Sequence, residues 1–241
     1  MSSAPSFGRR SPAGGLPVLP QPGPRPAWHV AIPLFLFIVA AAAALMIFQN
    51  YRSHPRPPVS PAEAAAIDHV LAGEQVSIPA IAAAPNVSLD YYDVDGTDAA
   101  AIRHDLDAKG PVDAGGRHLD AETRWHYDWH WPATADGSCG TPKADVSFSA
   151  VIRLPRLTHF ADLKPGLAQA WRSYMTALVR HEAGHVANGF EGRDAITAAV
   201  RSSSCADANA AGQQAIAALG GKDADYDRRT NHGATEGASF N

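Results

Sequence analysis

Aromatic and polar residues alternate strictly over residues 123–131, which is the most regular pattern in the chain. One set of alternating positions holds Trp125, Tyr127, Trp129 and Trp131, and the other holds Arg124, His126, Asp128 and His130. This two-residue period predicts a β-strand with one aromatic face toward the core and one face in water. Residues 144–154 alternate in the same way, and residues 87–94 carry a shorter version. We therefore expect three strands that form a small antiparallel sheet.

A helical period replaces the alternation in the second half of the chain. Apolar residues recur at steps of three and four, at Leu167, Trp171, Tyr174 and Leu178. His181 and His185 continue the same stripe. Pro165 suits the first turn of a helix, and Gly189 suits the position just past its end. The pattern predicts one long helix over residues 164–188 with both histidines facing the core.

Further helices are predicted after this one. We expect a second helix around residues 196–200 and a third over residues 207–219, which Gly220 and Gly221 would end. Strands first and helices later predict an α+β fold. In this fold the small antiparallel sheet packs against the long helix and two further helices.

The segment HEAGH, at residues 181–185, lies on the long helix. Two histidines four residues apart share one helical face, so His181 and His185 can both bind one metal ion. Glu182 lies between them and can act as the general base for a water molecule that Zn²⁺ activates. This pattern is typical of zinc-dependent peptidases. The alternative is a pair of solvated histidines, which would lie on the opposite face of the helix.

HEAGH needs a further ligand, because a catalytic zinc ion usually has three protein ligands. Glu191 lies six residues after His185, close to the third histidine of the HExxHxxGxxH pattern of the metzincins. Asp227 and His232 lie in a closing segment whose glycines indicate tight turns. Asp227 is alternatively a turn residue, or a residue that holds His232 by its far nitrogen. In the same segment, Tyr226 is either a core residue or a hydrogen-bond donor to a tetrahedral intermediate.

The first 85 residues have a different composition from the rest of the chain. Their first acidic residue is Glu63, and the Pro/Gly-rich opening is followed by an apolar run long enough to cross a bilayer. The run ends in Phe48 and Gln49 without a small-residue cleavage site, so we expect an uncleaved anchor rather than a signal peptide. The expected parts are a cytoplasmic tail (1–28), a transmembrane helix (29–49), a Pro/Ala-rich linker (50–85) and a zincin-like domain (86–241).

The chain has two cysteines, Cys139 and Cys205, which are too far apart in sequence for a CxxC motif. A pair in a secreted domain most often forms a disulfide, which favours an oxidising compartment. The alternative is two buried free thiols in a cytosolic domain. Together with the anchor, the pair predicts a single-pass inner-membrane protein whose C-terminal domain lies in the periplasm or outside the cell. The net charge of −4 and the lack of a basic patch give no argument for a nucleic-acid partner.

Several motifs occur together in one order within residues 86–241. They are YYDVDG, DAETRWHYDWHW, the LP before the long helix, a Trp followed by HEAGH, one Cys in each half, and the ending YDRRTNHGATEGASF. In these motifs the chain resembles the bacterial domain of unknown function 922 family, described as predicted secreted zinc-dependent proteases. The resemblance implies a secreted or periplasmic zinc peptidase of unspecified substrate. Because His232 lies in the family-like ending beside Gly233, it is the first choice for the third ligand, with Glu191 and Asp227 as alternatives.

The leading hypothesis is a membrane-anchored, externally facing peptidase that uses Zn²⁺ to cleave peptides or proteins. A rival hypothesis is a non-catalytic envelope module, in which the metal is structural or absent and the aromatic strand contacts a partner. His126 and His130 do not suggest a second metal site, because four residues along a strand span about 13 Å.

Overall fold

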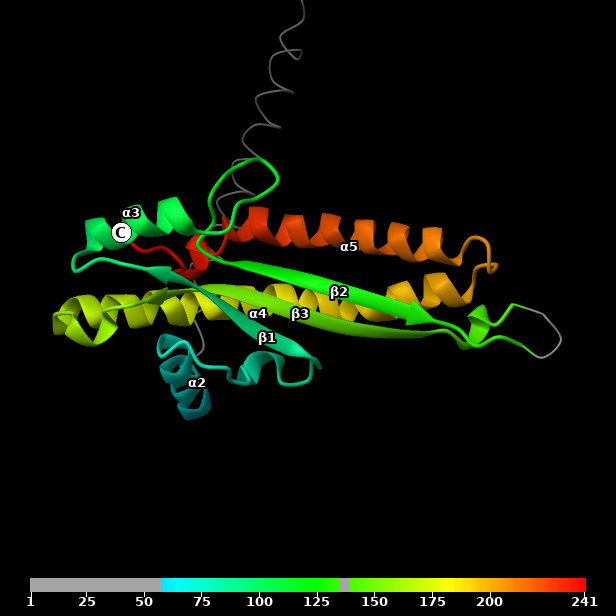
Figure 1. The fold of residues 1–241 in the computed structure, drawn as a ribbon, viewed down its shortest axis with the longest axis horizontal. Helices are drawn as coiled ribbons and strands as arrows, with labels where there is room; N and C mark the ends of the chain where they lie inside the picture. Colours follow the sequence, from blue (N-terminus) through cyan, green and yellow to red (C-terminus); the bar gives the residue numbers. More distant parts are fainter. Residues whose placement is uncertain (1–57, 135–138) are drawn as a thin grey trace, which may run out of the picture. The chain divides into compact units, whose positions relative to one another are not determined.

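The computed structural model describes residues 58–134 and 139–241. Within them, Val59–Asn241 forms one compact unit, an α+β fold with a three-stranded sheet and four α-helices (Figure 1). The predicted tail and anchor, residues 1–49, lie outside the described residues. Among the residues that are described, none of the helices is long and apolar enough to cross a membrane.

The sheet has the order β1-β3-β2, with β3 (Asp145–Leu157) in the centre. β2 (Glu122–His130) pairs with β3 in antiparallel fashion, whereas β1 (Val87–Val94) pairs with β3 in parallel. The prediction of a purely antiparallel sheet was therefore wrong. A parallel pair needs a long crossover, and the chain between β1 and β3 provides it through α3 (Ala99–Lys109) and β2.

The alternation in β2 and β3 gives the sheet one buried face, as predicted. In β3 the alternating positions that follow the predicted pattern are buried, namely Val146, Phe148, Ala150, Ile152 and Leu154. In β2, Tyr127 is buried and Trp125 and Trp129 are partly buried, while His126 and His130 are exposed. The long helix packs on the buried face, so the aromatic side of β2 lies directly against the segment that carries HEAGH.

This long helix, α4 (Pro165–Arg201), begins at the predicted proline but does not end at Gly189. A Cβ added at Gly189 would lie 2.6 Å from the Trp125 indole, and the Tyr127 hydroxyl donates a hydrogen bond of 2.7 Å to the Gly189 carbonyl. Glycine is thus needed here for the close approach of β2, not for a turn. The predicted second helix is the last part of α4, where Ile196 and Val200 are buried.

The next helix, α5 (Ala208–Thr230), also runs further than predicted. It continues through Gly220 and Gly221 and ends only at Thr230, where the capping residue Asn231 has a left-handed backbone (φ 49°). A short connection reverses the chain, so α5 runs antiparallel to α4 (Figure 1). The extension carries residues 223–230 back along α4 to the HEAGH segment.

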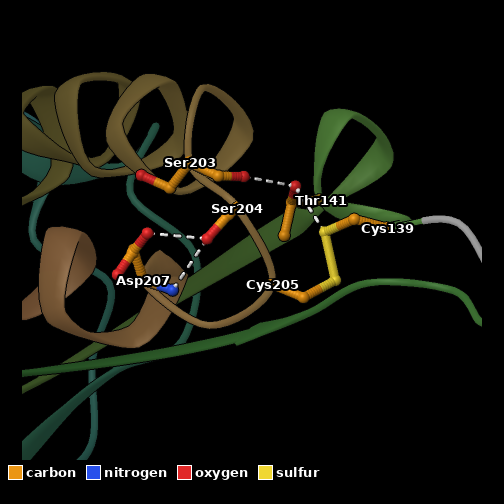
Figure 2. Close-up of a disulfide and its surroundings, with 6 residues drawn as sticks. All are labelled: Cys139, Thr141, Ser203, Ser204, Cys205 and Asp207. Atoms are coloured by element: carbon orange, nitrogen blue, oxygen red, sulfur yellow. Dashed lines mark hydrogen bonds between the residues drawn. A yellow bond between two sulfur atoms is a disulfide. The ribbon is translucent and has the colours of Figure 1, made fainter.

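A disulfide joins Cys139, in the connection between β2 and β3, to Cys205, in the turn between α4 and α5 (Figure 2). This confirms the predicted pairing. Beside it, the Thr141 hydroxyl donates a hydrogen bond of 2.7 Å to the Ser203 carbonyl (Figure 2). Both links hold the α4–α5 hairpin to the sheet at the end remote from HEAGH.

Residues 59–85, which we expected to be linker, pack on the domain. α2 (Pro61–Leu71) buries Ile67 and Val70, and Arg180 of α4 forms an ion pair with Glu63. The compact unit therefore begins well before the predicted start at residue 86.

Candidate metal centre

His181 and His185 lie one helical turn apart on α4 and both face inward. Their side chains are buried, with relative exposures of 3% and 7%, and their Nε2 atoms are 3.2 Å apart. The apolar stripe that precedes them explains this orientation, because it fixes which face of α4 meets the sheet and α5. The alternative of two solvated histidines is contradicted.

A carboxylate from α5 completes a triangle with the two imidazoles. Asp227 Oδ1 lies 3.2 Å from His181 Nε2 and 3.1 Å from His185 Nε2. Ligand atoms about 2.0–2.2 Å from a tetrahedral zinc ion are separated by about 3.3 to 3.6 Å. Two imidazole nitrogens and one carboxylate oxygen at this spacing fit a small divalent ion.

Glu182 belongs to the same cluster but at a wider spacing. One of its carboxylate oxygens lies within 4.8 Å of the histidine nitrogens, so His181, Glu182 and His185 form a group that can hold a metal ion. The Asp227 oxygen is closer to both nitrogens, so Asp227 suits a third ligand better, and Glu182 would lie beside a bound ion. Its Oε2 accepts a hydrogen bond of 2.7 Å from the Thr123 hydroxyl at the start of β2. Burial raises the pKa of Glu182, opposed by His185 and by this hydrogen bond.

The Nδ1 atom of each histidine contacts a second carboxylate. Glu236 Oε2 lies 2.9 Å from His181 Nδ1, and Asp223 Oδ1 lies 2.9 Å from His185 Nδ1. A carboxylate acceptor keeps the proton on Nδ1 and turns the lone pair of Nε2 toward the centre of the triangle. Asn188 donates to Asp223 and fixes it in turn.

The carboxylates make the pocket strongly favourable to positive charge. Burial disfavours the charged forms of the histidines, but hydrogen bonds to Asp227 and Glu236 outweigh it and raise the pKa of His181 to about 9. In the same way, Asp223 and Asp227 outweigh burial and raise the pKa of His185 to about 10. Burial raises the pKa of Asp227, but the two imidazoles outweigh it and hold that pKa well below its usual value. A divalent cation can supply the same positive charge in place of the protons.

The triangle lies in an open cavity of about 330 Å³. One wall is the segment before and into β2, and the floor comes from α4 and α5. The lining residues are Arg117, His118, Leu119, Asp120, Ala121, Glu122, Thr123, Leu178, His181, Glu182, His185, Asp223, Asp227, Asn231, His232 and Ala238.

Asp120 anchors the wall of this cavity. Arg103 of α3 donates to both of its carboxylate oxygens, and the buried Tyr174 hydroxyl of α4 donates to Oδ2 at 2.8 Å. The wall is therefore tied to two helices, which sets the position of Thr123 relative to Glu182.

His232, the first choice for the third ligand, lies behind Asp227 rather than beside the two histidines of α4. Its Nδ1 is 3.3 Å from Asp227 Oδ2, and its Nε2 accepts a hydrogen bond of 2.8 Å from Arg117 Nη2. The glycine that follows does permit a close approach, but to the ring of His181, since a Cβ at Gly233 would lie 2.9 Å from its Cγ. The geometry favours Asp227, our alternative, over His232.

The remaining candidates lie outside the triangle. Glu191 is exposed on the uninterrupted α4, about 9 Å along the axis from His185. The Tyr226 ring stacks on the ring of His181, with 5.0 Å between the ring centroids. A Cβ added at Gly184 would lie 2.5 Å from the Tyr226 hydroxyl oxygen. Tyr226 packs behind the histidine, which accounts for the glycine of HEAGH.

The sequence analysis missed Thr123, Asp223, Glu236 and Arg117. For Asp223 a signal existed, because Asp223 and Asp227 repeat on α5 the four-residue spacing of His181 and His185 on α4. The assumption that the last helix ended at Gly220 concealed it. For the other missed residues we find no local signal.

Comparison with curated proteins finds no match, and comparison with solved structures finds none either. One family model matches residues 89–233, which is more than half of the chain and includes most of β1, all of β2 and β3, HEAGH and Asp227. Its description is "Bacterial protein of unknown function (DUF922)". The chain therefore belongs to this DUF922 family, as its motifs predicted.

Proposed function

We propose that this protein is a zinc-dependent peptidase in which His181, His185 and Asp227 hold the metal and Glu182 is the general base. The observation that carries the proposal is the triangle of donor atoms, with edges of 3.1 to 3.2 Å, at the floor of an open cavity. Asp227 replaces His232 as the proposed third ligand.

The chemistry follows from these positions. A zinc ion bound to the triangle would act as a Lewis acid and lower the pKa of a water molecule toward neutrality. Glu182 takes a proton from the attacking water and passes it to the nitrogen of the leaving amine. Thr123 holds Oε2, and no described residue donates to Oε1, so that oxygen is available for the proton.

The openness of the site favours a catalytic metal over a structural one. Structural zinc sites are closed by four protein ligands, whereas catalytic sites keep one position for water or substrate. Here the three donor atoms of His181, His185 and Asp227 face a cavity, as the ligands of a catalytic site do. This supports the peptidase over the rival hypothesis of an envelope module with a structural or absent metal.

The proposed location follows from the disulfide and from the composition of the N-terminal segment. Disulfides persist in oxidising compartments, so the Cys139–Cys205 bond supports a domain in the periplasm or outside the cell. We propose that residues 29–49 anchor the chain in the inner membrane.

The test is zinc analysis and peptide cleavage by the full-length chain, compared with Glu182→Gln. The wild type should bind one zinc ion and cut peptides in a mixed library. Glu182→Gln should keep the zinc and lose a factor of about 10² to 10⁴ in kcat. If Glu182→Gln cuts as fast as the wild type, the mechanism is wrong. If removal of zinc unfolds the domain and no peptide is cut, the structural hypothesis is correct.

A further inference from the structure

We propose that Arg117 binds a carboxylate of the substrate, so that the protein prefers peptides with an acidic side chain or a free C-terminus near the cleaved bond. This inference rests on the proposed peptidase function and names its substrate class.

Arg117 is the only Arg or Lys among the described residues that line the cavity, whose other charged lining residues include several carboxylates. A negatively charged substrate group would be repelled over most of this surface. Near Arg117 it would be attracted. Apart from the proposed metal, Arg117 is therefore the group in the described lining that best suits an anionic group.

The loop that carries Arg117 is held by contacts within the loop itself. Asp113 Oδ1 accepts hydrogen bonds of 2.9 Å from the backbone N–H groups of Gly115 and Arg117. Asp113 Oδ2 accepts a hydrogen bond of 3.2 Å from Arg117 Nε. A β-bridge between Val112 and His118 closes the loop at its base. A guanidinium held in this way loses little further freedom when it binds a ligand.

The bonds that hold the guanidinium use only part of its donors. Nε donates to Asp113, and Nη2 donates to His232 at 2.8 Å and lies 3.2 Å from Asp113 Oδ2. Nη1 is left with no partner among the described residues. The side chain is 57% exposed, so a ligand can reach it from solvent. Because a guanidinium cannot accept a hydrogen bond, His232 Nε2 must be the acceptor. His232 therefore lies between the Arg117 guanidinium and the Asp227 carboxylate and contacts both.

The position of Arg117 sets which substrate residue it contacts. Two contacts, of 2.8 Å and 3.3 Å, and one imidazole ring separate it from the Asp227 carboxylate. An extended peptide advances about 3.3 Å per residue, so the bound carboxylate belongs to a residue within about three positions of the cleaved bond. An acidic side chain and a C-terminal carboxylate present the same chemistry to the guanidinium.

The experiment compares kcat/KM for matched peptides with the full-length, zinc-loaded protein. One arm exchanges Glu for Gln at each of the three positions on either side of the cleaved bond. The other arm compares free with amidated C-termini. Zinc content is measured for every variant, and the ratio of the acidic to the neutral peptide is the readout, since a general loss of activity cancels in it.

We expect the wild type to prefer the acidic member of at least one pair by about tenfold or more, and the arm that shows the preference identifies the source of the carboxylate. Arg117→Gln should reduce the ratio to about one, and Arg117→Lys should retain part of it. Arg229→Gln, an exposed arginine of α5 outside the cavity lining, is the matched control and should leave the ratio unchanged.

Cleavage without an acidic preference, or a preference that survives Arg117→Gln, would overturn this inference and leave the peptidase proposal intact. If the wild type cuts no peptide in either arm, the proposed function fails and the inference fails with it.

Discussion

Substituting Gly189 by alanine separates two explanations of why glycine stands in the middle of α4. Helix propensity alone predicts that Gly189→Ala stabilises the protein by about 1 kcal/mol. The structure predicts the opposite sign, because the added Cβ would lie 2.6 Å from the Trp125 indole, and real Cβ atoms essentially never approach closer than 3.0 Å.

The indole cannot move away at low cost. Its Nε1 donates a hydrogen bond of 3.0 Å to the His185 carbonyl, and its ring meets Tyr127 edge to face. Inserting a methyl group into such a contact costs about 1 to 3 kcal/mol. We therefore expect Gly189→Ala to lower the free energy of unfolding by about 1 kcal/mol, in a range of about 0 to 2 kcal/mol, after the gain in propensity.

Gly220→Ala is the matched control, since it also lies inside a helix but no atom lies within 4 Å of its added Cβ. It should stabilise the protein by up to about 1 kcal/mol. Urea denaturation measures both variants, and a difference of about 2 kcal/mol corresponds to a midpoint shift of about 1 M at a slope of about 2 kcal/mol/M. If Gly189→Ala is as stable as Gly220→Ala, the packing of β2 against α4 described above is wrong.

Three further predictions concern the contacts that hold the domain together. The hydrogen-bonded Arg180 lowers the pKa of Glu63, so their ion pair should stabilise the fold above the ordinary glutamate pKa of 4.5 and lose this contribution as the pH falls below that value. In urea titrations, Glu63→Gln should cost about 1 kcal/mol at pH 7 and less at pH 3, and equal losses at both would contradict the ion pair. Replacing Cys139 and Cys205 together by serine should lower the free energy of unfolding by about 4 kcal/mol at most, and an unchanged urea midpoint would show that the bond does not constrain the unfolded chain. Asp120→Asn should cost about 2 kcal/mol and also lower kcat, because the cavity wall loses its charged anchor; normal activity with normal stability would refute that role.

Sequence patterns predicted the strands well because side-chain alternation is a local property. The two-residue period of residues 123–131 and 144–154 places β2 and β3 and gives their buried faces. The period does not say which strand pairs with which. The parallel pairing of β1 with β3 depends on a crossover of some fifty residues, so it could not be inferred from the alternation.

The helix ends were predicted poorly for a related reason. Gly189 and Gly220 are chemically identical to the glycines that end helices, and only the tertiary neighbours separate the two uses. Trp125 comes from a strand more than sixty residues before Gly189, so nothing local identifies the contact.

The predicted helix length also affected the choice of a third ligand for the candidate metal centre. HEAGH and its inward orientation were predicted correctly, since both depend on spacing along one helix. The choice between Asp227 and His232 depends on where α5 ends. Because α5 continues to Thr230, Asp227 remains on the helical face that meets His181 and His185, while His232 falls in the left-handed turn beyond it.

The most direct test of this account is a crystal structure of the zinc-loaded protein with the metal located by anomalous scattering at the zinc edge. The account predicts one peak about 2.0 to 2.2 Å from His181 Nε2, His185 Nε2 and an oxygen of Asp227, with a fourth position open to the cavity. A peak coordinated by His232 in place of Asp227, or the absence of any peak between His181 and His185, would contradict it.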